Sequence, residues 1–394
     1  MNPDLPPVPG GPAPGVPTPV PIGPATLAPV PTLPTTEEDY YGFLRTPRFR
    51  WWKGLLGILA LGALTLVLGG ILGFVGMLID LATGAITWDQ LTDTARGEIP
   101  IGPALFIANN LGLAALIWAS MLLNRAFFGQ RGGFLGSIAG RLRWALLGRL
   151  ALVLGLPWAI WVGLDLALTP GIFSGMQITG PTIVLAALTL VTTPLQSVGE
   201  EYAFRGFVPR CVAAMIPNRR AALAVAAVVG SVLFMVAHAA ADPWLNVYYF
   251  GLGLVFTALT WRSGGLEASM LVHAVNNTIT LVPVVLAGAL TEAFNRSSGV
   301  AGPAILIPLA VGIILIGVLE WAMRRWHIAR TGAPGLAEMA PPMTSPATLA
   351  YGTPAAPDDR VTLDSYEHDH SPHRPTDPSS GDGQPGDRDG GGRP

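Results

Sequence analysis

Residues 55–79 read LLGILALGALTLVLGGILGFVGMLI, a run without a single charged side chain. An α-helix rises 1.5 Å per residue, so about 20 apolar residues cross the roughly 30 Å hydrocarbon core of a bilayer. That core offers the backbone no hydrogen-bond partner outside its own segment, and a spanning segment of this kind must therefore be helical. The run predicts a transmembrane helix.

Comparable apolar runs recur along the chain. They lie at residues 101–123, 145–166, 182–198 with a helical extension, 221–241, 247–261, 266–290 and 304–323. The composition agrees, because only 12% of the 394 residues are charged and the mean hydropathy is +0.49, whereas soluble proteins carry about 25% charged residues. We predict an all-α polytopic membrane protein with about eight transmembrane helices, its helical domain covering residues 51–328.

Charge and cysteine content exclude several classes of protein. The formal net charge is −2, so no basic field points to a nucleic-acid partner. Cys211 is the single cysteine, which excludes an intrachain disulfide and a thiolate metal cluster. The partner that this composition indicates is membrane lipid.

Both ends of the chain differ from the apolar middle. Residues 1–45 contain a proline every few positions, and residues 331–394 are rich in Pro, Gly, Ser and Asp. Segments of this composition bury too little apolar surface to offset the entropy lost on ordering. We predict two disordered tails.

Basic residues alternate between the connections. One set flanks one side of the predicted bundle: Arg45, Arg48, Arg50 and Lys53, then Arg125, Arg131, Arg141 and Arg143, then Arg219 and Arg220, then Arg262, and finally Arg324, Arg325 and Arg330. The opposite connections contain only Arg96 and Arg296. Arginine-rich loops stay in the cytoplasm, so we expect a multi-pass protein of the cell membrane with both termini cytoplasmic.

Ionisable residues interrupt the fourth apolar run, where residues 199–206 read GEEYAFRG. Such side chains cost about 2.5–3.5 kcal/mol in a membrane and mark functional sites. On a helix, Glu201 and Arg205 are four residues apart and can pair, whereas Glu200 is rotated by about 100° and lacks this partner. An unpaired buried carboxylate suits proton transfer. The alternative is a purely structural knot of ion pairs.

Two histidines lie within the hydrophobic helices. His238 ends the stretch Phe234-Met235-Val236-Ala237-His238, and His273 stands four residues before Asn277 on one helix face. Taken singly, each histidine is typical of a hydrogen bond between helices. In a hairpin whose turn lies at residues 217–220, however, Glu200 and His238 come to the same level, which favours a shared site.

The three motifs together resemble those of the CAAX protease and bacteriocin-processing (CPBP) family, which includes the type II CAAX prenyl endopeptidases. The family is recognised by Glu-Glu-x-x-x-Arg, Phe-x-x-x-His and His-x-x-x-Asn motifs, in that order. This sequence carries all three, as Glu200-Glu201 to Arg205, Phe234 to His238, and His273 to Asn277. The resemblance covers about residues 181–286.

The resemblance implies an intramembrane endopeptidase acting on membrane-associated or prenylated peptides. Glu200 and His238 would polarise the attacking water, and His273 and Asn277 would hold the oxyanion by hydrogen bonds. Glu201 and Arg205 would shape the site. The catalytic cavity is then expected between the fourth, fifth and seventh helices.

The family is also described as one of metalloproteases, which leaves two readings of the same residues. Glu200, His238 and His273 could ligate zinc and leave a fourth position open. We prefer a mechanism that requires no cofactor, because an asparagine amide such as that of Asn277 is a poor zinc ligand and a good oxyanion donor.

Other functions remain as alternatives. A proton-coupled transporter could use the glutamates and histidines as a relay, although the inverted repeat typical of transporters is not visible in the sequence. A non-catalytic scaffold or self-immunity protein of the same family would not need an intact set of motif residues. The zinc-protease motif His-Glu-x-x-His does not occur.

Overall fold

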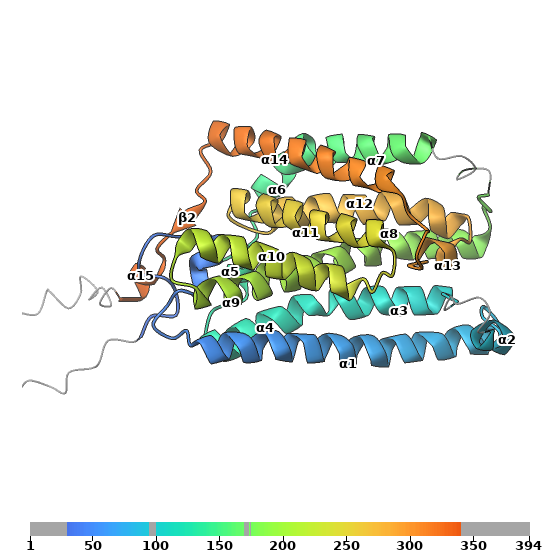
Figure 1. The fold of residues 1–394 in the computed structure, drawn as a ribbon, viewed down its shortest axis with the longest axis horizontal. Helices are drawn as coiled ribbons and strands as arrows, with labels where there is room; N and C mark the ends of the chain where they lie inside the picture. Colours follow the sequence, from blue (N-terminus) through green and yellow to red (C-terminus); the bar gives the residue numbers. More distant parts are fainter. Residues whose placement is uncertain (1–29, 94–99, 169–172, 174, 340–394) are drawn as a thin grey trace, which may run out of the picture. The chain divides into compact units, whose positions relative to one another are not determined.

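The computed structural model describes residues 30–93, 100–168, 173 and 175–339, and almost all its regular structure is helical. The long segments are α1 (Trp51–Thr83), α3 (Pro103–Ala114) with α4 (Leu116–Phe128), α6 (Trp144–Leu150) with η2 (Ala151–Gly155) and α7 (Leu156–Leu168), α8 (Gly180–Glu201) with η3 (Tyr202–Phe207) and α9 (Val208–Met215), α10 (Arg219–Ala237), α11 (Pro243–Ser263), α12 (Glu267–Leu286), and η4 (Pro303–Leu306) with α14 (Ile307–Arg325). Each predicted apolar run thus becomes a long helical segment (Figure 1).

Short elements connect these segments. They are η1 (Tyr40–Leu44), α2 (Trp88–Thr92), α5 (Gly133–Gly136), α13 (Leu290–Ala293), α15 (Gly335–Met339), and the strands β1 (Glu38–Asp39) and β2 (Thr331–Gly332). The strands pair antiparallel, Glu38 opposite Gly332 and Asp39 opposite Thr331.

Among the described residues, seven helical segments are long and apolar enough to cross a membrane. Helix α11, predicted as one of eight, is not among them because polar residues such as Asn246 and Arg262 lower its hydropathy. It nevertheless runs alongside α10 and α12 (Figure 1). Strand β1 precedes the first span and β2 follows the last. Because the two strands pair with each other, both lie on the same side of the membrane. That arrangement requires an even number of crossings, and α11 counted with the seven makes the predicted eight.

The outer helices face lipid. On α1, Leu66 is 78% exposed and Phe74 is 66% exposed, which in water would leave a large apolar surface uncovered. A bilayer solvates such side chains. The fold is therefore that of an all-α, multi-pass membrane protein, as the sequence predicts.

The tails start further out than the sequence indicates. The prediction that residues 30–45 and 331–339 are disordered is wrong, because β1, η1 and β2 lie within them. The aromatic residues that end the proline-rich stretch supply the missing apolar surface: Tyr40, Tyr41 and Phe43 are fully buried, and the Tyr40 hydroxyl donates to the carbonyl of Leu135 at 2.5 Å. Residues 1–29 and 340–394 lie outside the described residues, where disorder stays a prediction.

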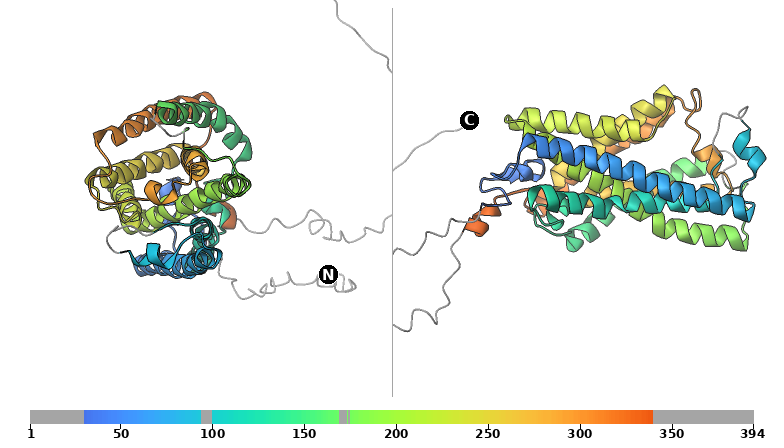
Figure 2. Two further views of the ribbon diagram at one scale, coloured as in Figure 1. Left: turned by 90° about the vertical axis from the view of Figure 1, so that its right-hand side faces the viewer. Right: turned by 90° about the horizontal axis from the view of Figure 1, so that it is seen from below.

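Figure 1 shows α15 at one end of the helical bundle and α2 and α13 at the opposite end, and the right-hand view of Figure 2 shows the same arrangement. We call these the tail end and the far end. The arginine-rich connections lie at the tail end, which the sequence predicts to be cytoplasmic.

Candidate active site

A cavity of about 580 Å³ opens within the far half of the bundle. Glu200, His238, His273 and Asn277 all line it, so the structure brings together the residues that three separate motifs supply. The expected walls from the fourth, fifth and seventh helices are present. The prediction named too few helices, however, because α3 and α11 also line the cavity, through residues that include Asn110 and Tyr249.

Close helix packing sets the position of Glu200. At the preceding residue, Gly199, an added Cβ would collide with the carbonyl group of Leu113 on the neighbouring helical segment. Only glycine permits this approach. Directly after Glu201, the helix widens into the π-helical segment η3, a distortion that occurs frequently at functional sites.

Glu201 and Arg205 form the expected pair, with 3.0 Å between Arg205 Nη1 and Glu201 Oε1. Both side chains are buried. The contact is electrostatic, because the Arg205 Nη atoms make no well-formed hydrogen bond to any described residue. Instead the guanidinium lies over the ring of Phe234, 3.9 Å from its centroid. The phenylalanine of the second motif thus covers the cation of the first.

His273 receives the second contact of Glu201, which the sequence did not predict. Its Nδ1 lies 2.8 Å from Glu201 Oε1, and its ring stacks on Phe256 with centroids 5.0 Å apart. Because a carboxylate only accepts hydrogen bonds, this contact places the Nδ1 proton on His273 and turns Nε2 toward the cavity. Glu201 therefore orients the histidine as well as pairing with Arg205.

Glu200 and Asn277 lie on either side of that Nε2 atom. Glu200 Oε2 is 3.4 Å from it, and Asn277 Nδ2 is 3.1 Å from it. Asn277 Nδ2 is also 3.3 Å from Gln196 Oε1, one turn before Glu200. Glu200 thus lacks the arginine partner of Glu201, as expected, and contacts the edge of His273 instead.

His238 lines the same cavity but makes different contacts. Its Nδ1 lies 2.8 Å from the carbonyl oxygen of Phe234, so Nδ1 carries the proton and Nε2 is free to accept. The ring stacks on Tyr249, with centroids 3.8 Å apart. Ala239, the next residue, adopts a left-handed φ of 48°, which turns the chain sharply after the histidine.

The three candidate zinc ligands do not form a ligand set. Among the described residues, no three His, Cys, Asp or Glu side chains are grouped so that they could hold a metal ion. Glu200 and His273 are close, but the described contacts of His238 go to Phe234 and Tyr249. The arrangement of the side chains does not fit a zinc site.

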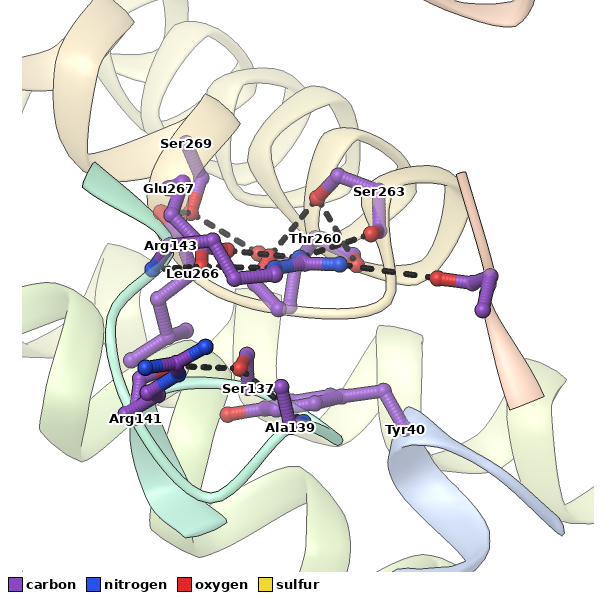
Figure 3. A network of polar contacts seen from close by, with 12 residues as sticks. Tyr40, Ser137, Ala139, Arg141, Arg143, Thr260, Ser263, Leu266, Glu267 and Ser269 are labelled. Carbon is purple, nitrogen blue, oxygen red and sulfur yellow. Dashed lines mark hydrogen bonds and ion pairs between the residues drawn. The ribbon is translucent and has the colours of Figure 1, made fainter. Parts of the chain in front are cut away.

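The start of α12, six residues before His273, is fixed by a polar network (Figure 3). Arg143 binds the buried carboxylate of Glu267 through Nε at 2.9 Å and Nη2 at 2.8 Å. Its Nη2 also donates to the carbonyl of Ser263 at 2.8 Å, and Thr260 donates to Ser269 at 2.8 Å. This network anchors the helix that carries His273 and Asn277.

Sequence reasoning missed this network and the aromatic residues around the histidines. Tyr249 and Phe256 lie on α11 and stack on the two histidine rings. Nothing in the local sequence distinguishes them from lipid-facing aromatic residues. The buried pair of Asn110 with Thr192 and Thr193, at 3.1 Å each, agrees with the interhelical role expected of an asparagine in a span.

The fold and site define a class: a multi-pass membrane protein with a glutamate–histidine cluster between its spanning helices. Residues 179–279 match the family model of the type II CAAX prenyl endopeptidases, described as Rce1-like. The resemblance predicted from the three motifs is confirmed, and the matched family is one of membrane proteases.

The chain is also similar to the uncharacterized protein YyaK of Bacillus subtilis (strain 168), with 25% identity over 181 residues. That alignment covers 43% of this chain and 59% of the relative, so the chain spans less than two thirds of the relative's length. No solved structure matches the chain.

Proposed function

We propose that this protein is an intramembrane endopeptidase that cleaves membrane-associated or prenylated peptides with a water molecule activated by Glu200. One observation carries the proposal: Glu200, His273 and Asn277 are in contact at the wall of a cavity that His238 also lines. The match of residues 179–279 to a protease family supports the same class.

In this mechanism Glu200 takes a proton from the water as its oxygen attacks the peptide carbonyl carbon. His238 Nε2 accepts a hydrogen bond from the same water, since its Nδ1 is engaged by the Phe234 carbonyl. When the tetrahedral intermediate collapses, the C–N bond breaks and Glu200 returns the proton to the leaving nitrogen. A single carboxylate thus acts as base and then as acid.

The oxyanion is held by His273 and Asn277. With Nδ1 bound to Glu201, His273 can donate to the oxyanion only if Nε2 also carries a proton, and Asn277 Nδ2, 3.1 Å from Nε2, must then turn from that atom to the oxyanion. Two N–H donors then lie side by side at the cavity wall, as an oxyanion hole requires. The charged side chains around His273 are the carboxylates of Glu200 and Glu201 and, paired with Glu201, the guanidinium of Arg205.

This mechanism needs no cofactor, in keeping with side chains that do not form a ligand set. The orientation in the cell membrane stays the one predicted from the arginine-rich connections. With both termini cytoplasmic, the cavity lies nearer the opposite face, so substrate reaches it from within the bilayer or from that face.

The experiment is incubation of the purified full-length protein, in lipid nanodiscs, with a panel of prenylated and unprenylated carboxyl-terminal peptides, with and without a strong chelator. We expect mass spectrometry to find two fragments whose masses add up to one peptide plus one water, with and without chelator. Reversible loss of cleavage on chelation would overturn the metal-free mechanism. Intact peptides throughout the panel would contradict the proposed substrates.

A further inference from the structure

The short helix η1 packs against the first motif, although it lies far outside the matched residues 179–279. All five of its residues are buried. A Cβ added at Gly206, the residue after Arg205, would come within 3.4 Å of the Tyr40 hydroxyl. Tyr40 and Tyr41 also share one buried cluster with residues of η3, namely Tyr202, Ala203 and Phe207. The N-terminal segment is therefore part of the packing around the motif.

Tyr41 brings this packing close to the catalytic side chains. Its hydroxyl donates to the carbonyl of Thr257 at 3.3 Å, and both groups are buried. Thr257 directly follows Phe256 on α11, and the Phe256 ring stacks on His273. The centroid of the same ring lies 5.1 Å from the guanidinium carbon of Arg205. One contact thus connects Tyr41 to the residue next to a ring that touches both side chains.

The charges of the buried ion pair also act on Tyr41. The side chain is 1% exposed, and burial raises the pKa of its phenol far above the usual range. The carboxylate of Glu201 raises this pKa further, whereas the guanidinium of Arg205 lowers it. Both charges of the pair are therefore within electrostatic reach of the hydroxyl, and the phenol faces them as a neutral group.

The ion pair depends on the exclusion of water. Among the described residues, Glu201 Oε2 and both Nη atoms of Arg205 are buried without a hydrogen-bond partner. The attraction between two charges is stronger where water is absent. Water admitted from the side of η1 would compete for these atoms and would loosen the 2.8 Å contact between Glu201 Oε1 and His273 Nδ1. The ring of Tyr41 occupies space from which such water could reach the pair.

The segment that carries Tyr41 is fixed by contacts of its own. The carboxylate of Asp39 accepts a hydrogen bond from Trp261 Nε1 at 3.1 Å, and the carbonyl of Phe43 accepts one from Gln130 Nε2 at 2.7 Å. Strand β1, directly before η1, pairs with β2. Tyr41 is thus held in one position by groups that belong to neither the cavity nor the motifs.

We propose that Tyr41 is a positioning residue of the active site: its ring keeps water from the pair of Glu201 with Arg205, and this pair holds His273 in its working orientation. Tyr41 is not among the described residues that line the cavity, so it acts through the pair and not on the substrate. The inference rests on the proposed function and adds to the site a residue from the N-terminal segment.

Steady-state kinetics on a peptide that wild type cleaves test the role, with full-length variants in nanodiscs. Tyr41→Ala should lower kcat by about 10²-fold, the loss that a displacement of about 1 Å in a catalytic group can cause, while KM stays near the wild-type value. Tyr41→Phe retains the ring and should restore most of kcat. Tyr41→Leu should give an intermediate kcat, and it decides the case if Tyr41→Ala does not fold.

Phe43→Ala is the matched control. Its ring is as buried as that of Tyr41 and lies on the same short helix, but it packs on Phe134, with centroids 6.2 Å apart. Phe43→Ala should lose thermal stability to a similar extent as Tyr41→Ala and keep the wild-type kcat. This comparison separates positioning of the site from general loosening of the segment.

A second measurement does not depend on cleavage. In protein labelled with ¹⁵N-histidine, a ring N–H proton bound to a carboxylate gives a far-downfield resonance, and the signal of His273 is the one that disappears in Glu201→Gln. Wild type, Tyr41→Phe and Phe43→Ala should retain this signal. Tyr41→Ala should lose it, because the Nδ1 proton then exchanges with water.

The outcomes separate this inference from the proposed function. Retention of the His273 signal in Tyr41→Ala, or a fall in kcat in Phe43→Ala as large as in Tyr41→Ala, overturns the role of Tyr41 even if peptides are cleaved. A wild-type kcat in Tyr41→Leu, or a raised KM with unchanged kcat in Tyr41→Ala, overturns it as well. Loss of the signal in Tyr41→Ala, in a protein that cleaves no peptide, would support the positioning role and contradict the protease.

Discussion

The two ends of the bundle differ in what their polar side chains contact. At the tail end, the buried Arg210 donates to the carbonyl of Phe134 at 3.0 Å and to Gln130 Oε1 at 2.9 Å, and Arg143 binds Glu267. The far end contains two cavities, the active-site cavity and a second one of about 870 Å³. Ile101 lines both.

This difference separates two uses of buried polar residues. At the tail end they bind protein groups and hold the helices and the N-terminal segment together. At the far end, Glu200, His238 and Asn277 keep polar atoms directed at a cavity, where a substrate can meet them. Glu201 belongs to both categories, because it pairs with Arg205 and orients His273. Substitutions should therefore affect stability, activity or both according to this division.

Glu201→Gln should produce the largest loss of stability. It leaves the buried Arg205 without its carboxylate, and breaking a buried ion pair costs about 3–5 kcal/mol. Activity should fall as well, because His273 loses the partner of Nδ1. Denaturation in mixed micelles measures the free energy of unfolding. The matched control is Glu320→Gln on α14, where the pairs with Arg324 and Arg330 are more exposed and worth about 1 kcal/mol or less. If both variants lost the same free energy of unfolding, the buried pair of Glu201 with Arg205 would contribute no more than the more exposed pairs of Glu320.

Asn277→Ala should act on activity alone. Removal of one oxyanion donor reduces kcat about 10²–10³-fold, while KM changes little because the oxyanion exists only in the transition state. Steady-state kinetics on a cleaved peptide measure both. A raised KM with unchanged kcat would assign Asn277 to substrate binding instead.

Tyr40→Phe should have the smallest effect, confined to the tail end. It removes the hydroxyl that binds the Leu135 carbonyl, and an unsatisfied buried acceptor costs about 1–3 kcal/mol. The unfolding free energy should drop by that amount while kcat stays at the wild-type value. A fall in kcat as large as the one in Asn277→Ala would show that the two ends are coupled.

The sequence predicts the helices and the site residues for different reasons. Apolar runs locate the helices because a backbone segment inside the bilayer must satisfy its own hydrogen bonds and is therefore helical. The same argument predicted α11 despite its polar residues. The motif residues Glu200, His238 and His273 stand out because ionisable groups are costly in a membrane. The hairpin spacing accounts for the common level of Glu200 and His238, but it does not place His273, which lies on a separate helix.

What the sequence did not predict depends on contacts between distant segments. Arg143 and Glu267 are 124 positions apart, and no local pattern pairs them. The contact of Glu201 with His273 likewise depends on how α8 and α12 pack. Residues 30–45 fall within the stretch predicted to be disordered, and that prediction overlooked Tyr40, Tyr41 and Phe43, which are buried against the bundle.

The most direct test of the central claim compares wild type with Glu200→Gln on one peptide that wild type cleaves. Glutamine has the shape of glutamate but cannot accept the proton of water, so the account predicts a loss of at least about 10²–10⁴-fold in kcat. The unfolding free energy should change far less than in Glu201→Gln, and affinity for the uncleaved peptide should be retained. Cleavage by Glu200→Gln at a rate near that of wild type would contradict the assignment of Glu200 as the base.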